Sequence, residues 1–215
     1  MSFLFDARDY TLLHQNVFRD DFPGYRPSIV ESPNGDGNWD TQKKYAHIAQ
    51  KYLADDKDKI RAKQLGNLLV QCNDYAVALA NKMGVPPEFY PDSRYSTIRV
   101  LDYPPDAITH PHTDFNLFTV MLYRDKPNNF RYIGKEPEKS LQDLSPHLHY
   151  GEIMEDISQF LPHPVVATEH EVIADKDRQR SIVFFAIPDW DAFLPSGLTV
   201  GRWLERRLST SRKQV

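Results

Sequence analysis

Three residues of this chain, far apart in sequence, are of the types that bind a catalytic metal ion. His112 and Asp114 lie in the stretch His110 to Phe115, and His170 follows fifty-six positions after Asp114. Two imidazoles and one carboxylate on one face of a metal ion leave the opposite positions open for substrate and O₂, as in non-haem Fe(II) sites. The set therefore predicts an open metal site with oxidising chemistry.

The His-x-Asp pair is suited to the end of a β-strand. Side chains two residues apart in a strand point to the same side, so His112 and Asp114 can reach one ion while Thr113 points away. A His-x-Asp tripeptide by itself is a weak signal, because such tripeptides often arise by chance. The surrounding sequence has to decide its meaning.

The segments around these residues predict short antiparallel strands flanked by helices. Stretches that are rich in β-branched and aromatic residues and separated by turn residues predict strands at 96–103, 116–123, 165–173 and 181–187. Apolar residues at helical spacing predict helices around 45–53, over 65–83 and over 197–210. The expected fold class is mainly β with flanking helices.

Length and composition favour one domain. With 215 residues and 40% hydrophobic content, the chain can bury a sizeable core but has little room for two ordinary domains. We expect residues 1–94 to form an irregular lead-in and helices, residues 95–190 to form the β core, and residues 197–210 to form a C-terminal helix.

Charge and cysteine content narrow the class of partner. The formal net charge is −4 with no long run of one sign, so no nucleic-acid or membrane patch is expected. The single cysteine, Cys72, excludes an intrachain disulfide and a thiolate metal cluster. The start of the chain lacks a signal-peptide pattern, and the longest apolar run, Ile182 to Ile187, is too short to span a bilayer. We expect a cytoplasmic protein that binds a small molecule; the oligomeric state stays open.

A series of motifs follows a definite order along the chain. Tyr103-Pro104-Pro105 precedes His112-x-Asp114, His170 follows, and the run Arg178-Gln179-Arg180-Ser181-Ile182 comes before Phe184-Phe185. This order resembles the isopenicillin N synthase-like branch of the Fe(II)/2-oxoglutarate-dependent oxygenases, over residues 65–208 and only poorly over 1–64. The resemblance implies a double-stranded β-helix, which is a jelly roll or cupin-like barrel, with His112, Asp114 and His170 as the iron ligands.

The resemblance also implies an activity. The implied enzyme is a dioxygenase that uses Fe(II), 2-oxoglutarate and O₂ to hydroxylate a C–H bond of a small molecule, with release of succinate and CO₂. Tyr103 and Ser181 match positions that hold the cosubstrate in the family. Asp114 argues against halogenation, because halogenating relatives give up the carboxylate. Arg99 shares the Tyr103 face of a regular strand, where it either meets an anionic substrate or is exposed.

One position departs from the family pattern. The cosubstrate arginine normally stands two residues before the serine, where this chain has Gln179, flanked by Arg178 and Arg180. In a regular strand both arginines would point away from the face shared by Gln179 and Ser181, so a bulge or register shift is needed to bring either guanidinium inward. A glutamine amide cannot supply that charge. Two alternatives therefore stay open: an iron oxidase on this scaffold that does not use 2-oxoglutarate, and a non-catalytic metal-binding jelly-roll protein.

Other histidines offer a different metal site. His110 with His112, and His147 with His149, form two His-x-His pairs that could build a Zn or Cu site of cupin type. Proline next to His110 and His147 predicts loops, where histidines commonly face solvent. We therefore favour the His112, Asp114 and His170 set. The substrate itself cannot be read from the sequence, since substrate choice in such folds depends on loops.

Overall fold

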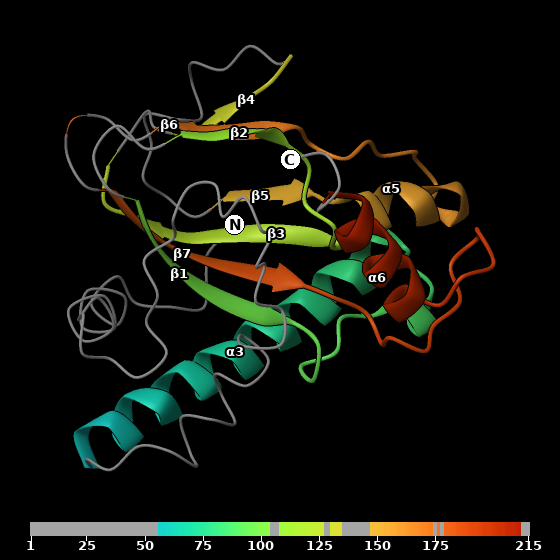
Figure 1. The fold of residues 1–215 in the computed structure, drawn as a ribbon. Coiled ribbons are helices and arrows are strands. Elements are labelled where there is room, and N and C mark those ends of the chain that lie inside the picture. Colours follow the sequence, from blue (N-terminus) through green and yellow to red (C-terminus); the bar gives the residue numbers. More distant parts are fainter. Residues whose placement is uncertain are drawn as a thin grey trace.

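The strands form two antiparallel sheets stacked face to face (Figure 1). The computed structural model describes residues 56–103, 108–126, 130–134, 147–173, 176 and 179–211. The four-stranded sheet has the order β1 (Thr97–Tyr103), β7 (Gln179–Ala186), β3 (Phe118–Arg124), β5 (His147–Tyr150). The three-stranded sheet has the order β2 (Ile108–His112), β6 (His170–Ile173), β4 (Phe130–Tyr132).

Successive strands alternate between the two sheets. The odd-numbered strands make the larger sheet and the even-numbered strands make the smaller one, so that β1 pairs with β7 and β2 pairs with β6 across long stretches of sequence. This alternation defines a double-stranded β-helix. The fold implied by the sequence resemblance is confirmed.

Helices flank the larger sheet and cover its ends. Helix α3 (Asp56–Met83) packs on the outer face of that sheet, and α6 (Val200–Ser211) lies near the short helix α5 (Glu152–Ile157), as Figure 1 shows. Single 3-10 turns follow α3 and α5, at Pro87–Phe89 and Ser158–Phe160. Among the described helices, none is long and apolar enough to cross a membrane.

The helix expected over 65–83 is present as part of α3, and the C-terminal helix begins at Val200, after a turn in which Gly197 has a φ of +80°. The irregular lead-in and the helix around 45–53 lie outside the described residues. The organisation of residues 1–215 as one domain therefore stays a prediction.

Two strands, β4 and β5, were not expected from the sequence, and both are short. β2 ends at His112, as the His-x-Asp pair suggested, but Pro111 interrupts its alternation and its pairing with β6 is irregular. The strand expected at 165–173 is confined to its last four residues. The backbone that precedes this strand forms hydrogen bonds outside the three-stranded sheet. The Thr168 amide donates to the Tyr150 carbonyl, and the Ala167 amide donates to the Glu155 carboxylate.

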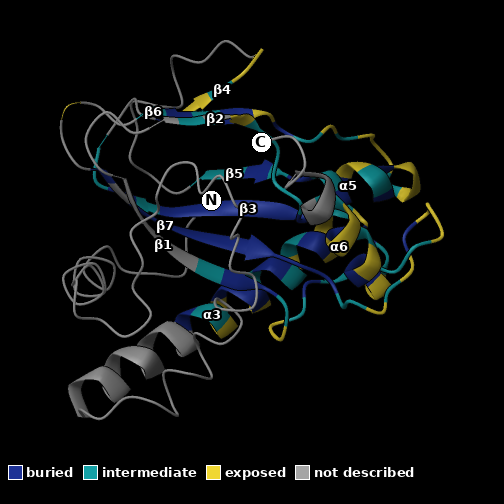
Figure 2. Cartoon of the chain, in the orientation of Figure 1, coloured by how far each residue is buried: buried dark blue, intermediate teal, exposed yellow. Residues whose placement is uncertain are grey.

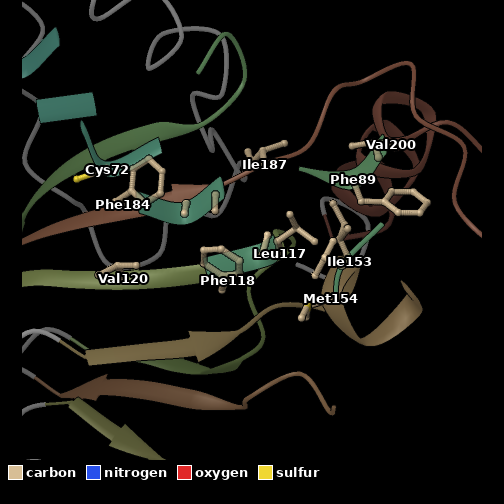
Figure 3. Packing of buried hydrophobic residues seen from close by; sticks show 14 of the residues in the cluster. Cys72, Phe89, Leu117, Phe118, Val120, Ile153, Met154, Phe184, Ile187 and Val200 are labelled. Carbon is tan, nitrogen blue, oxygen red and sulfur yellow. The ribbon is translucent and has the colours of Figure 1, made fainter. Parts of the chain in front are cut away.

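The main hydrophobic core lies between the larger sheet and the helices. Strands β3 and β7 are largely buried (Figure 2), and their outward-facing residues pack with the apolar face of α3 and with α5 and α6. Figure 3 shows this packing around Phe118, Val120 and Phe184. Alternate residues of the same strands, Met121, Val183 and Phe185, face the smaller sheet and pack against Phe130 and Val172.

A β-bulge in β3 breaks this alternation near the end of the strand. Met121 pairs with Val183 and Tyr123 pairs with Ile182, so Leu122 is an extra residue. Leu122 and Tyr123 both pack in the outer core, and Arg124 returns to the inner side opposite Ser181. The bulge therefore changes which residue at the end of β3 faces the space between the sheets.

Candidate metal centre

The two sheets bring His112, Asp114 and His170 together. His112 ends β2 and pairs in register with His170, the first residue of β6, while Asp114 follows two residues after the end of β2. Their potential ligand atoms all lie within 4.8 Å of one another. The Asp114 carboxylate is 3.9 Å from Nε2 of His112 and 3.9 Å from Nε2 of His170. Such separations are too long for hydrogen bonds but allow both atoms to reach one ion at about 2.1 Å each.

His170 is oriented so that its Nε2 could bind a metal ion. Its Nδ1 lies 3.0 Å from the Thr168 carbonyl, to which it can donate, and this leaves Nε2 facing Asp114 and His112. Burial lowers the pKa of His170 to about 4, although the Asp114 charge acts in the opposite direction. The ring is therefore neutral near pH 7, with an Nε2 lone pair available to a metal.

Asp114 is held by hydrogen bonds to one of its two oxygens. The Thr119 hydroxyl donates to Oδ2 at 2.5 Å while accepting from Asn116 Nδ2 at 2.7 Å, and His149 Nε2 lies 3.0 Å from the same Oδ2. Burial alone would raise the pKa of Asp114, but the hydrogen bond from His149 and the charges of the neighbouring histidines outweigh it and lower the pKa. An ionised carboxylate with a fixed orientation is the form that binds a metal.

The turn that carries Asp114 is anchored to the start of α5. The Glu152 amide donates to the Asp114 carbonyl at 2.8 Å, and the Glu152 carboxylate accepts from the Thr113 hydroxyl at 2.5 Å and from Arg207 of α6 at 2.6 Å. A Cβ atom on Gly151 would lie 2.2 Å from the Asn116 carbonyl oxygen, so only glycine allows this close approach. The C-terminal helix is thus joined to the metal-site turn.

Ser181, one of the predicted cosubstrate residues, lines the inner side of β7 together with Gln179, which stands where the family has its arginine. Gln179 and Ser181 are each 1% exposed, and Gln179 Oε1 and Ser181 Oγ have no hydrogen-bond partner among the described residues. Tyr103 pairs in register with Gln179, which agrees with their expected proximity, although the Tyr103 side chain is not described.

The structure describes less of Arg178 and Arg180, the arginines that flank Gln179. Arg178 lies outside the described residues. The pairing of β1 with β7 is regular at this point, and Arg180, whose side chain is not described, pairs with Asp102 at the position between Gln179 and Ser181. Arg99 pairs with Val183, and its side chain is likewise outside the described part. The sequence predicted that β7 would need a bulge or register shift to turn Arg178 or Arg180 inward. The register shift that the structure shows lies in β3, between Met121 and Tyr123.

The structure corrects the interpretation of the second His-x-His pair. His147 and His149 lie on β5 rather than in a loop, and His149 is only 3% exposed. The His149 ring centroid is 4.5 Å from that of His170. The alternating run His147-Leu148-His149-Tyr150 is typical of a strand, but the proline before His147 led to the prediction of a loop. The group brought within metal-binding distance among the described residues contains His112, Asp114 and His170, without either His147 or His149.

Arg124 is a buried residue of the inner face that the sequence analysis did not single out. Its side chain is 2% exposed, and it lies opposite Ser181 on the inner side of the larger sheet. Burial raises the pKa of the Tyr132 hydroxyl to about 12, and the positive charge of Arg124 opposes that shift. Tyr132 in turn pairs in register with His170. No sequence signal pointed to Arg124, because regular alternation along β3 would place it on the outer face with Val120 and Leu122.

Comparison with known proteins gives structural matches only. No protein-family model and no curated protein matches the sequence. Among solved structures, a full-length Neurospora crassa protein in complex with alpha-KG matches with a TM-score of 0.59 and 17% identity, over 74% of this chain and 60% of that chain. The dioxygenase for auxin oxidation in rice matches with a TM-score of 0.57 and 12% identity, over 96% and 83%. Its Arabidopsis thaliana counterpart, a 2-oxoglutarate binary complex, has a TM-score of 0.54 and 14% identity, over 86% and 80%.

These matches define the class of fold. The chain has the double-stranded β-helix of the 2-oxoglutarate-dependent dioxygenases, as the sequence resemblance implied. It spans about 60% of the length of the Neurospora crassa protein. The isopenicillin N synthase-like branch stays a prediction, since the comparisons do not distinguish branches.

Proposed function

We propose that this protein is a non-haem Fe(II)- and 2-oxoglutarate-dependent dioxygenase. The observation that carries the proposal is the convergence of two histidines and one carboxylate, His112, Asp114 and His170, between the sheets of a dioxygenase fold. The donor set fits Fe(II), because neutral imidazole and carboxylate are its usual ligands in oxygenases with open coordination positions.

The chain's own residues would hold and shield the metal. His112, Asp114 and His170 would bind iron, and Thr119 and His149 would orient the Asp114 carboxylate through Oδ2. The apolar cluster that includes Met121, Phe130 and Phe185 would exclude water beside the centre. When bound, iron and 2-oxoglutarate supply the oxidising chemistry, in which decarboxylation of the oxo acid to succinate and CO₂ accompanies hydroxylation of a substrate C–H bond.

The substrate that we propose is a small molecule. The Neurospora crassa protein has been solved with thymine and with 5-formyluracil, in structures that match this chain at TM-scores of 0.53 and 0.56. Those ligands belong to that protein, and this chain's substrate would differ with its loops. We keep the proposal at the class of small organic substrates, with Arg99 as a candidate contact for an anionic one.

Succinate formation tests this proposal. Protein loaded with Fe(II) under ascorbate should convert 2-oxoglutarate to succinate and consume O₂, slowly without substrate and faster with a substrate. His170→Ala should abolish the conversion. His163→Ala is a matched control, because His163 is an exposed histidine outside the centre, and it should behave as wild type. Equal succinate formation by wild type and His170→Ala would contradict the proposal.

The alternatives predict different results in the same assay. An oxidase on this scaffold would bind Fe(II) and consume O₂ without forming succinate. A non-catalytic protein would bind a metal at His112, Asp114 and His170 and consume neither O₂ nor 2-oxoglutarate.

A further inference from the structure

We propose that Arg124 of β3 binds the distal carboxylate of the oxo-acid cosubstrate, in place of an arginine on β7. This inference rests on the proposed function. It assigns the role to a strand other than the one that carries the Arg-Gln-Arg-Ser run, and it explains how Gln179 can stand at the position where an arginine is expected.

The first support is the β-bulge at Leu122. Thr119 and Met121 face the inner side, since Thr119 contacts Asp114 and Met121 packs in the inner core. Continued alternation would turn Arg124 outward, but the extra residue reverses the order, and Arg124 lies opposite Ser181. The bulge thus places a cation where the regular β7 strand presents a neutral amide.

The second support is the chemistry of the inner face at Ser181. Arg124 is 2% exposed, and a guanidinium removed from water binds an anion more strongly because the surroundings screen the charge less. The Ser181 hydroxyl, 1% exposed and without a partner among the described residues, can donate to the same anion. Because Gln179 is neutral, Arg124 is the one cation described in this buried region. An arginine at position 179 would repel Arg124.

The third support links this end of the barrel to the metal centre. Thr119 lies on the same inner face of β3 as Arg124 and donates to Asp114 Oδ2, and Tyr132 of the facing sheet pairs with His170. Arg124 therefore faces the same interior as the metal ligands. An oxo acid that chelates the metal at one end would direct its other carboxylate along the inner face of β3 and β7.

Calorimetric binding to Mn(II)-loaded protein tests the assignment without turnover. The probes are 2-oxoglutarate and 2-oxopentanoate, in which a methyl group replaces the distal carboxylate. Wild type should prefer 2-oxoglutarate by roughly tenfold to a hundredfold, the range expected for hydrogen bonds to a charged group. Arg124→Met should remove this preference and leave 2-oxopentanoate binding unchanged. Arg131→Met, at an exposed arginine of β4, is the matched control and should keep the preference.

A relocation variant guards against a purely structural effect. Arg124→Gln combined with Gln179→Arg moves the guanidinium back to β7 and should regain part of the preference that Arg124→Gln alone loses. A wild-type preference that persists in Arg124→Met would overturn the assignment while leaving the proposed function intact. Failure of Mn(II)-loaded wild type to bind either oxo acid would instead overturn the proposed function.

Discussion

The two faces of the larger sheet are built from the same strands but have different contents. On the outer face, Phe118, Val120, Ile182, Phe184 and Ala186 form a continuous apolar surface under the helices. On the inner face, the same strands bury Thr119, Arg124, Gln179 and Ser181. Apolar burial stabilises a fold, whereas buried polar and charged groups cost free energy unless they are paired. The comparison teaches that the outer face is built for stability, whereas the inner face carries the polar groups of the candidate site.

The largest expected effect is on the outer face. Phe184→Ala should lower the free energy of unfolding by about 3–5 kcal/mol, because the ring is fully buried and leaves a cavity. Urea denaturation followed by circular dichroism measures this loss. Val70→Ala, at an exposed apolar residue of α3, should change stability by less than about 0.5 kcal/mol. The folded fraction of Phe184→Ala should bind metal as tightly as wild type, and a weakened site would break the separation of the two faces.

A second prediction concerns the support of the metal ligand from the inner side. His149→Leu removes the hydrogen bond to Asp114 Oδ2 and should weaken Fe(II) or Mn(II) binding by about 10–100-fold, the usual effect of losing an outer-shell partner. Metal titration by calorimetry measures it, with His163→Leu as the control. Unchanged affinity in His149→Leu would mean that Thr119 alone fixes the carboxylate.

A third prediction concerns the stability of the metal-free protein when Arg124, on the inner face of the larger sheet, is replaced. Arg124→Met replaces a buried cation by an apolar side chain of similar length, so the free energy of unfolding of the metal-free protein should change far less than in Phe184→Ala. A loss of about 3–5 kcal/mol, the usual cost of breaking a buried ion pair, would show that Arg124 is a structural residue.

The smallest expected effect is at Cys72 of α3, in the core that covers the outer face. Burial raises the pKa of this thiol to about 12, so the thiolate that reacts is scarce near neutral pH. Ellman's reagent should leave Cys72 unmodified in the native protein and titrate it fully in denaturant. Rapid reaction in the native protein would mean that the packing between α3 and the sheet opens readily.

The sequence was sufficient to predict the fold and the three residues that converge at the candidate metal centre. Types and spacing identified His112, Asp114 and His170, and the motif order identified the double-stranded β-helix. The helix over 65–83 and the strand around 181–187 were also visible, because long apolar stripes and β-branched runs are strong local signals.

The rest depended on tertiary structure. The inward position of Arg124 follows from a bulge that shifts the alternation by one residue, and nothing in residues 118–124 marks that shift. His149 was misjudged because Pro146 suggested a loop, whereas pairing with β3 makes residues 147–150 a strand. Short strands and bulges are set by the partner strand rather than by local propensity.

The most direct test is an anaerobic titration of the metal-free protein with Fe(II) and then with 2-oxoglutarate, recorded by visible absorption. We predict a metal-to-ligand charge-transfer band that saturates at one equivalent of each and is absent from His170→Ala. Failure of wild type to bind iron, or binding of iron without the band at saturating 2-oxoglutarate, would contradict a 2-oxoglutarate-dependent iron centre at His112, Asp114 and His170.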